Sequence, residues 1–389
     1  MKSPRIFVAL AALSVLGFAN SQASAPAGAV WLETAFRFAS AIDADPKDQA
    51  KAQELVVRDL VELGRIEEAI RRAGEIRGWR QGACFADLAR ELAAAGRPEE
   101  ARELIARAEQ VRRGVEGWQN PRIASHVAGA LAALGDLESS RKISRDLAIH
   151  DAQQYAGQAV SLMATAHSAR GDFDAAMDYL RKLEGRKDIY ETWWRTMGYV
   201  AVARAEGLSR DQRLAALDAA SDSADGIDAG ARPAALEAIA EEYVARGERK
   251  RARKLLERAQ ESIETMGGSP SVQAAMLTGI ARAWTSAGDT VRAGKLLGRA
   301  QPLVARSLEI ERPGMYAAIA AVHLAAGKED DARRLIDIAL TEAEGLRNSR
   351  PRALALVTIC RNLGRQGHGD DPAVLERIDS IFRGLGDPW

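Results

Sequence analysis

Aromatic side chains return at one place in the sequence, and their chemistry suits ligand binding. Trp79, Trp118 and Tyr190 precede Gly96, Gly135 and Gly207 by the same spacing, and Tyr155 precedes Gly171 by one position less. Trp and Tyr rings offer large apolar faces with one polar atom each. An exposed ladder of such rings would bind an extended peptide or the C–H faces of a glycan. The alternative is that the rings fill gaps between neighbouring helices.

The adjacent pair Trp193 and Trp194 favours an exposed ladder, because neighbouring helical residues point about 100° apart and two such rings are hard to bury together. Polar residues on the same helices would form a hydrogen-bonding groove beside the rings; they are Arg90, Ser125, His126, Ser161, Thr165 and Arg204. A solvated face without a ligand explains these residues equally well. The predicted partner-binding residues are Trp79, Trp118, Tyr155, Tyr190, Trp193, Trp194, His126 and Arg204.

No spacing of residues indicates catalysis or metal binding. The five histidines show no i,i+4 pair, no HExxH motif and no cysteine partner. His167 and His323 stand where other copies of the repeat have Leu, Tyr or Trp, so we expect both in the core. Lys plus Arg and Asp plus Glu both total 54, which leaves no overall field to attract nucleic acid. We predict no catalytic residue, no metal and no cofactor.

A repeated two-helix unit must position these residues, and residues 234–259 show it most clearly. Leu236, Ile239 and Tyr243 follow helical spacing, Gly247 interrupts the helix, and Leu256 belongs to a second apolar stripe. Glycines in the same role occur at similar intervals, at positions 64, 96, 135, 171, 207, 247, 288, 327 and 364. A single hairpin cannot bury both stripes, so the copies must stack.

These copies resemble tetratricopeptide repeats over roughly Asp48 to Phe382. The resemblance is carried by the hinge glycine, by a small residue seven positions before it, and by patterns after it such as Ala252, Leu256 and Ala259. Most steps exceed the family period of about 34 residues, so the array is divergent. The resemblance implies an all-α fold: an α-solenoid, wound as a right-handed superhelix, of about nine helix-turn-helix repeats. It also implies a concave face that binds a peptide or protein partner.

The start of the chain predicts export. Lys2 and Arg5 precede an apolar run, Ile6–Phe18, that is shorter than the roughly 20 residues needed to span a bilayer. We predict a signal peptide at 1–23, an N-terminal segment with a capping helix at 24–47, the repeat array at 48–382 and a tail at 383–389. The mature protein would have no transmembrane segment and would be periplasmic in a bacterium, otherwise secreted. We expect one elongated domain with its end copies facing solvent.

The predicted function is that of an exported, non-catalytic interaction scaffold that binds a peptide segment or protein partner on its concave face. The alternative is a cell-wall glycan-binding or glycan-cleaving protein built on a helical superhelix. The repeats use nearly all of residues 48–382 and leave no room for a separate catalytic domain. Cys84 and Cys360 fall in distant copies, and each packed helix layer adds about 8–10 Å, so we expect two unpaired, buried thiols.

Overall fold

The computed structural model describes residues 28–42, 45–149, 153–183, 189–266, 268–366 and 371–385. Within these ranges the chain forms nineteen helices and no strand. The predicted signal peptide lies outside the described residues. The helices are α1 (Ala29–Ser40), α2 (Pro46–Glu62), α3 (Ile66–Glu75), α4 (Trp79–Ala94), α5 (Pro98–Arg113), α6 (Gln119–Leu134), α7 (Leu137–Ile149), α8 (Gln153–Ala169), α9 (Phe173–Arg181), α10 (Ile189–Arg204), α11 (Arg210–Ala224), α12 (Arg232–Ala245), α13 (Arg249–Thr265), α14 (Pro270–Ser286), α15 (Thr290–Ala305), α16 (Arg312–Ala325), α17 (Glu329–Gly345), α18 (Ser349–Arg365) and α19 (Pro372–Arg383).

The predicted all-α, tetratricopeptide-like solenoid is confirmed. The helices pair into hairpins from α2 and α3 onward, and eight of the nine predicted hinge glycines join the two helices of a hairpin with φ between 71° and 90°. This left-handed region favours glycine because it lacks a Cβ atom. Both stripes of the unit that begins at Ala234 are buried, including Leu236, Ile239, Tyr243 and Leu256.

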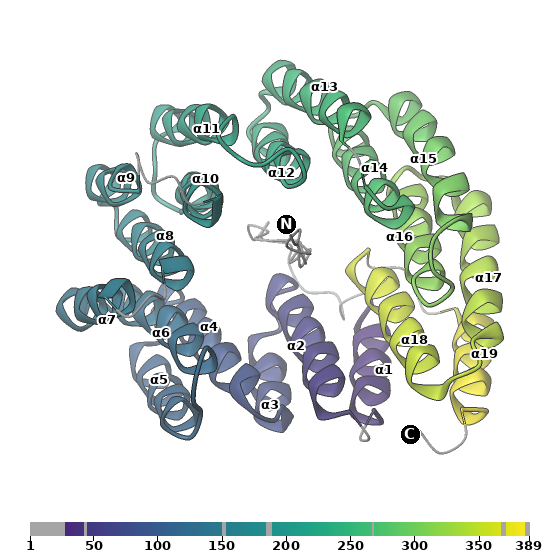
Figure 1. Cartoon of the computed structure of the whole chain (residues 1–389), viewed down its shortest axis with the longest axis horizontal. Helices are drawn as coiled ribbons and strands as arrows, with labels where there is room; N and C mark the ends of the chain where they lie inside the picture. Colours follow the sequence, from purple (N-terminus) through teal and green to yellow (C-terminus); the bar gives the residue numbers. More distant parts are fainter. Residues whose placement is uncertain are drawn as a thin grey trace, which may run out of the picture.

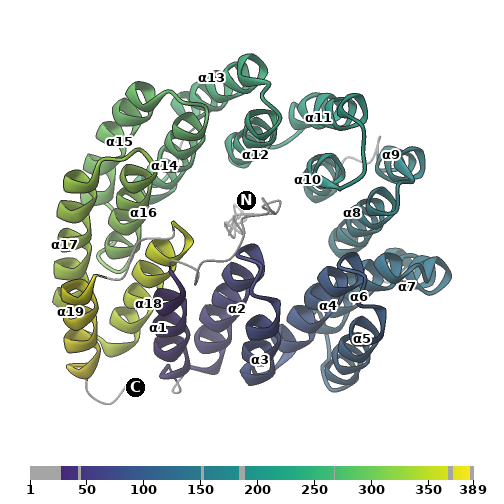
Figure 2. The ribbon, with the colours of Figure 1, turned by 180° about the vertical axis from the view of Figure 1, so that it is seen from behind.

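The array bends until its two ends meet, so the protein is a ring (Figure 1). The first helices of the hairpins lie inside the ring and the second helices lie outside, and the view from behind shows the same closed arrangement (Figure 2). The expectation of an elongated domain with solvent-facing ends is therefore wrong. The hinge glycines lie along one rim of the ring, and the connections between hairpins lie along the other, which we call the junction rim.

Helix α1 closes the ring. It packs along α18 more extensively than α19 does, although α19 follows α18 in the chain, and its other side packs against α2. In this position α1 replaces the second helix of the ninth hairpin, and α19 lies outside it. Trp31, Leu32, Phe36 and Phe38 are accordingly almost completely buried. The predicted capping helix thus exists, but it joins the two ends of the array instead of shielding one end from water.

Gly364, the ninth predicted hinge, has another role. It lies in the last turn of α18, which ends at Arg365, and its φ is not positive as at the other hinge glycines. A Cβ atom at Gly364 would lie 3.0 Å from the Leu32 side chain, and one at Gly28 would overlap the Gly364 carbonyl oxygen. Glycine at both positions therefore allows α1 to approach α18 closely. The glycine-rich region after Gly364 includes residues outside the described part.

Polar and aromatic contacts reinforce the closure. The Asp59 carboxylate of α2 is completely buried and accepts hydrogen bonds from Arg361 Nε at 2.5 Å and Arg361 Nη2 at 2.9 Å, on α18. The rings of Phe38 on α1 and Phe382 on α19 stack with their centroids 4.2 Å apart. Residues from opposite ends of the chain are thereby held together.

Small residues allow the inner helices to crowd together. A Cβ atom at Gly129 would lie 2.6 Å from Leu162 of the next inner helix, and one at Gly314 would lie 2.8 Å from Thr358 of the next. The inner side of a ring has a shorter circumference than the outer side, so its helices must approach more closely. Gly279 makes a similar contact with Glu237 of α12, and Gly198 is close both to Ser161 of α8 and to Leu180 of the outer helix α9.

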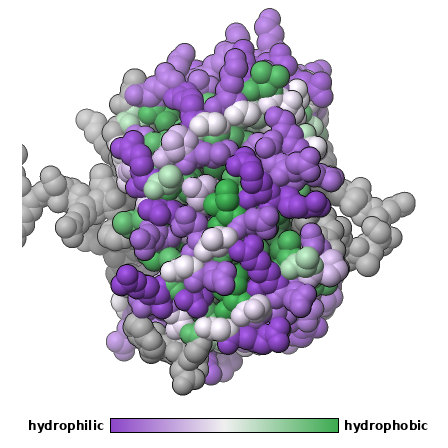
Figure 3. Space-filling model, turned by 90° about the vertical axis from the view of Figure 1, so that its right-hand side faces the viewer, coloured by the Kyte–Doolittle hydropathy of each residue, from purple (hydrophilic) through white to green (hydrophobic). Residues whose placement is uncertain are grey.

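The side of the ring that faces right in Figure 1 is mainly hydrophilic, with hydrophobic residues in small separate groups (Figure 3). Among the described residues no helix has the length and apolar character needed to cross a membrane.

Cys84 and Cys360 are free and buried, as predicted, and burial raises the pKa of both thiols. His167 and His323 are also buried, which confirms their predicted place in the core.

Replacing Arg361 with Ala should destabilise the ring strongly, because the Asp59 carboxylate would stay buried with only Arg365, 3.8 Å away, near it. We expect a loss of about 3 kcal/mol in the free energy of unfolding, measured by urea denaturation. Arg377→Ala is the matched control, since its exposed pair with Asp337 should contribute less than about 1 kcal/mol. Equal effects of the two substitutions would show that closure does not depend on the buried pair.

Candidate functional site

Two of the predicted aromatic residues lie together on the junction rim. Trp79 begins α4, Trp118 precedes α6, and their ring centroids are 5.2 Å apart in an edge-to-face arrangement. The guanidinium carbons of Arg80 and Arg122 lie 4.4 Å and 4.6 Å from the Trp79 centroid. Trp79 is half-buried by these contacts, whereas the Trp118 side chain is 53% exposed. The fixed Trp79 side chain therefore supports the accessible Trp118 side chain.

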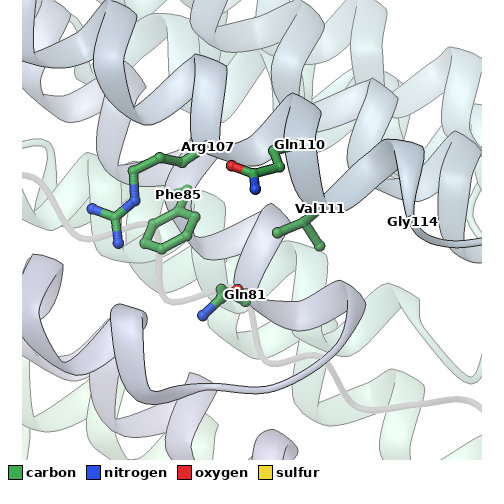
Figure 4. A pocket seen from close by; sticks show the side chains of 6 residues that line it. All are labelled: Gln81, Phe85, Arg107, Gln110, Val111 and Gly114. Atoms are coloured by element: carbon green, nitrogen blue, oxygen red, sulfur yellow. The ribbon is translucent and has the colours of Figure 1, made fainter.

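Two pockets adjoin the connection that carries Trp118. One, of about 320 Å³, lies between α4 and α5, where the Arg107 guanidinium carbon is 4.0 Å from the Phe85 centroid (Figure 4). The other, of about 760 Å³, lies between that connection, the start of α6 and the end of α7, and its lining includes Gly117 and Asn120 on either side of Trp118. We call the surface formed by Trp79, Arg107, Trp118 and Arg122, with the buried Phe85 next to Arg107 and with these two pockets, the Trp118 patch.

Of the other predicted aromatic residues, Trp193 and Trp194 do not join this patch, whereas Tyr155 packs against residues that line its larger pocket. Tyr155 is half-buried against a small apolar cluster that includes Ala124 and Leu147. Trp193 is half-buried against the main core, and Trp194 packs over α8, where a Cβ atom at Gly157 would lie 3.4 Å from its ring. The Tyr190 side chain lies outside the described part. The structure therefore brings Trp79 and Trp118 into contact and leaves Tyr155, Trp193 and Trp194 at separate packing positions.

His126 belongs to a polar chain across three inner helices. Its Nδ1 atom lies 2.8 Å from Asp87 Oδ1 on α4, and its Nε2 atom lies 3.1 Å from the Gln158 amide nitrogen on α8. Burial opposes ionisation of Asp87, but His126, Arg90 and Arg58 hold the pKa of that carboxyl well below its usual range. In a hydrolase an Asp–His pair presents the second ring nitrogen to a nucleophile. Here that nitrogen faces an amide, so the pair links helices.

Arg204 lies in a buried ion-pair cluster on the inner helices. Its Nε atom donates to Glu242 Oε1 at 2.5 Å, and Arg246 lies 2.8 Å from the other oxygen of that carboxylate. The side chains of Arg204 and Glu242 are only 8% and 7% exposed. The guanidinium of Arg204 is thus used within the protein, where it connects α10 to α12.

Sequence reasoning missed an acidic pair on the inner face, Glu237 and Glu241. One guanidinium, from Arg282 on α14, lies 2.7 Å from Glu237 and 3.2 Å from Glu241. Burial, with the neighbouring Glu241 carboxylate, raises the pKa of Glu237 to about 7 against the opposing charge of Arg282. The i,i+4 spacing of the two glutamates was visible in the sequence. Their shared partner, which belongs to the next copy of the repeat, was not.

No group of three or more metal-ligating side chains occurs among the described residues. The inner face therefore carries charges that pair mainly with one another, whereas the Trp118 patch carries accessible apolar surface next to two pockets. The residues of the patch that sequence reasoning missed are Phe85, Arg107 and Arg122. The sequence carried no signal for these residues, because the contact of each arginine with an aromatic ring is visible only in the packed hairpins.

No protein-family model matches the chain, and no curated protein sequence matches it. Among solved structures, a circular tandem repeat protein with novel repeat topology is 14% identical, with 92% of this chain and 96% of that chain covered and a TM-score of 0.30. Ton1535 from Thermococcus onnurineus NA1 is 17% identical, with coverages of 81% and 91% and a TM-score of 0.27. The APC/C hetero-tetramer Cut9–Hcn1 is 13% identical, with 82% of this chain and 77% of that chain covered and a TM-score of 0.25.

The raised pKa of Glu237 predicts a pH-dependent stability. Its native pKa of about 7 exceeds the ordinary value of 4.5, so the native state keeps a proton that the unfolded chain releases between these values. This stabilising contribution is complete below pH 4.5 and disappears as pH rises to about 7. Glu237→Gln should remove a negative slope of at most about 1.4 kcal/mol per pH unit from the free energy of unfolding.

Urea denaturation of the wild type and Glu237→Gln at several pH values tests this prediction, since other titrating groups cancel in the difference. Glu257→Gln is the control, because Glu257 forms an exposed pair with Arg292. A difference between wild type and Glu237→Gln that stays constant from pH 4.5 to 8 would contradict the prediction.

Proposed function

We propose that the protein is an exported, non-catalytic interaction scaffold that binds a segment of a partner protein at the Trp118 patch. The observation that carries the proposal is the exposure of Trp118 beside a half-buried Trp79 that two guanidinium groups hold in place. Exposed tryptophans next to pockets are typical anchors of protein interfaces, because one ring can bury a large area at low entropic cost.

The patch is a better candidate than the concave face that the sequence suggested. On the inside of the ring, Asp59, Arg204 and Glu242 have partners within the protein. A ligand there would have to replace existing ion pairs, at a cost in desolvation. At the patch, by contrast, binding would cover the apolar ring of Trp118, which is favourable by itself.

Glycan binding is the second candidate for the same residues, since sugar C–H faces also stack on tryptophan. A glycan ladder would need several accessible rings in a row. Trp118 is well exposed, whereas Tyr155 and Trp193 are half-buried against apolar clusters. A single accessible ring fits one anchor side chain of a peptide better than a row of sugars. Glycan cleavage would need a paired acid and base, and the inner glutamates Glu237 and Glu241 instead share one arginine.

Trp118→Ala should weaken peptide binding by the patch. We expect peptides selected from a random display library on the wild-type protein to bind the variant at least about tenfold more weakly, because the anchor ring is lost. Fluorescence anisotropy with labelled peptides would measure the dissociation constants.

Ile310→Ala provides a matched control. Ile310 precedes Gly327 by the same spacing as Trp118 precedes Gly135, and it is 56% exposed on the same rim of a later hairpin. Peptides that lose affinity equally for both variants, or for neither, would rule out the Trp118 patch as the binding surface.

Export is tested separately. A reporter enzyme that is active only outside the cytoplasm, fused after residue 28, should be active in a bacterial host and should lose activity when Leu10 and Leu13 are replaced by Arg, because the charges interrupt the apolar run. Sequencing the amino terminus of the secreted product should show cleavage after Ala23. An inactive fusion would contradict export and leave the binding proposal untouched.

A further inference from the structure

We propose that the partner segment is acidic, with one side chain that covers Trp118 and carboxylate side chains that pair with Arg107 and Arg122. This inference rests on the proposed function and names the chemistry of the partner. It follows from two arginines in the Trp118 patch that have no carboxylate partner in the described part of the chain.

Arg107 is the first of these charges. In later copies the same repeat position holds Arg258 and Arg299, which pair with Asp225 and Glu264 of the preceding outer helix. Arg107 reaches the preceding outer helix at Gly74, where a Cβ atom would lie 3.6 Å from its Nη2 atom. No carboxylate among the described residues pairs with it. The preceding outer helix therefore supplies a carboxylate partner to the arginine in two later copies, whereas Gly74 supplies none to Arg107.

Arg122 is the second. Its guanidinium lies over Trp79, and its Nε atom is buried without a hydrogen-bond partner among the described residues. Arg80, which lies over the same ring, is neutralised by Glu54. The larger pocket is lined by Glu116 and Asp146 together with Lys142 and Arg112, and Arg112 pairs with Glu109. Among the described residues, the arginines of the patch without a carboxylate partner are thus Arg107 and Arg122.

The stacked geometry favours a carboxylate as the missing partner. A guanidinium that lies over an aromatic ring uses its face for that contact and keeps its N–H edge available for hydrogen bonds. Carboxylates match this edge with two parallel hydrogen bonds. Phe85 holds Arg107 and Trp79 holds Arg122, so both groups are oriented before a ligand arrives. An acidic segment with one aromatic or large aliphatic side chain satisfies both arginines and Trp118.

The test uses three sets of short synthetic peptides that share a central Trp or Leu flanked by Glu, by Gln or by Lys. We expect the Glu set to bind the wild-type protein at least about tenfold more tightly than the Gln set, with a difference that shrinks as salt rises, and the Lys set not to bind. Arg107→Gln and Arg122→Gln should each remove most of the advantage of the Glu set.

Arg299→Gln is the matched control, because it occupies the repeat position of Arg107 and already has a carboxylate partner. It should leave peptide binding unchanged. Arg122→Lys keeps the charge but loses the planar edge, so it should retain part of the Glu preference, and thermal unfolding followed by circular dichroism would confirm that each variant is folded.

Two outcomes would overturn the inference. One is equal binding of the Glu and Gln sets with full dependence on Trp118, which would leave the proposed function in place and remove only the acidic partner. The other is Arg107-dependent binding of an anionic polysaccharide or of anionic lipid vesicles in the absence of any peptide binding. Loss of every Trp118-dependent interaction would instead reject the proposed function itself.

Discussion

The packing of α1 against α18 is the constraint on which the rest of this structure depends. An open array of hairpins leaves an apolar face at each end, and terminal copies usually have to make that face polar. Here Leu32 of α1 meets Gly364 of α18, and the buried pair of Asp59 and Arg361 fixes α2 against the same helix. No end remains to be capped in the described ring, so the first and last elements can be as apolar as the middle ones.

Closure also determines what the inside of the ring can contain. Inner helices share a short circumference, and glycines such as Gly129 and Gly314 let neighbouring helices approach. Side chains brought so close together lose water, and charges without water require partners. This explains why Glu242 has two arginines and why Glu237, which shares one arginine with Glu241, has a raised pKa. The proposed partner binding is therefore easier at the junction rim, where the connections between hairpins leave the Trp118 side chain and two pockets accessible.

The sequence predicted what is local and missed what is distant. Hinge glycines, helix boundaries and buried stripes follow from spacing within a single copy of the repeat, so hairpins such as the one around Gly247 were predictable. Gly364 has the same spacing but lies inside a helix, because its neighbour is Leu32 and not the next helix of its own hairpin. The aromatic positions were visible in the same way. Their environments differ because Trp118 meets the edge of Trp79, whereas Tyr155 meets an apolar cluster.

A closed ring gives the Trp118 patch a property that an open solenoid lacks. The hairpins of an open array can shift relative to one another as the whole array stretches or bends, whereas a ring joined by α1 resists such motion. A partner loses less conformational entropy on a surface whose groups already hold their positions. Closure through residues at the two ends of the array would thus support the proposed recognition at α4 to α7, which the α2–α3 hairpin connects to the point of closure.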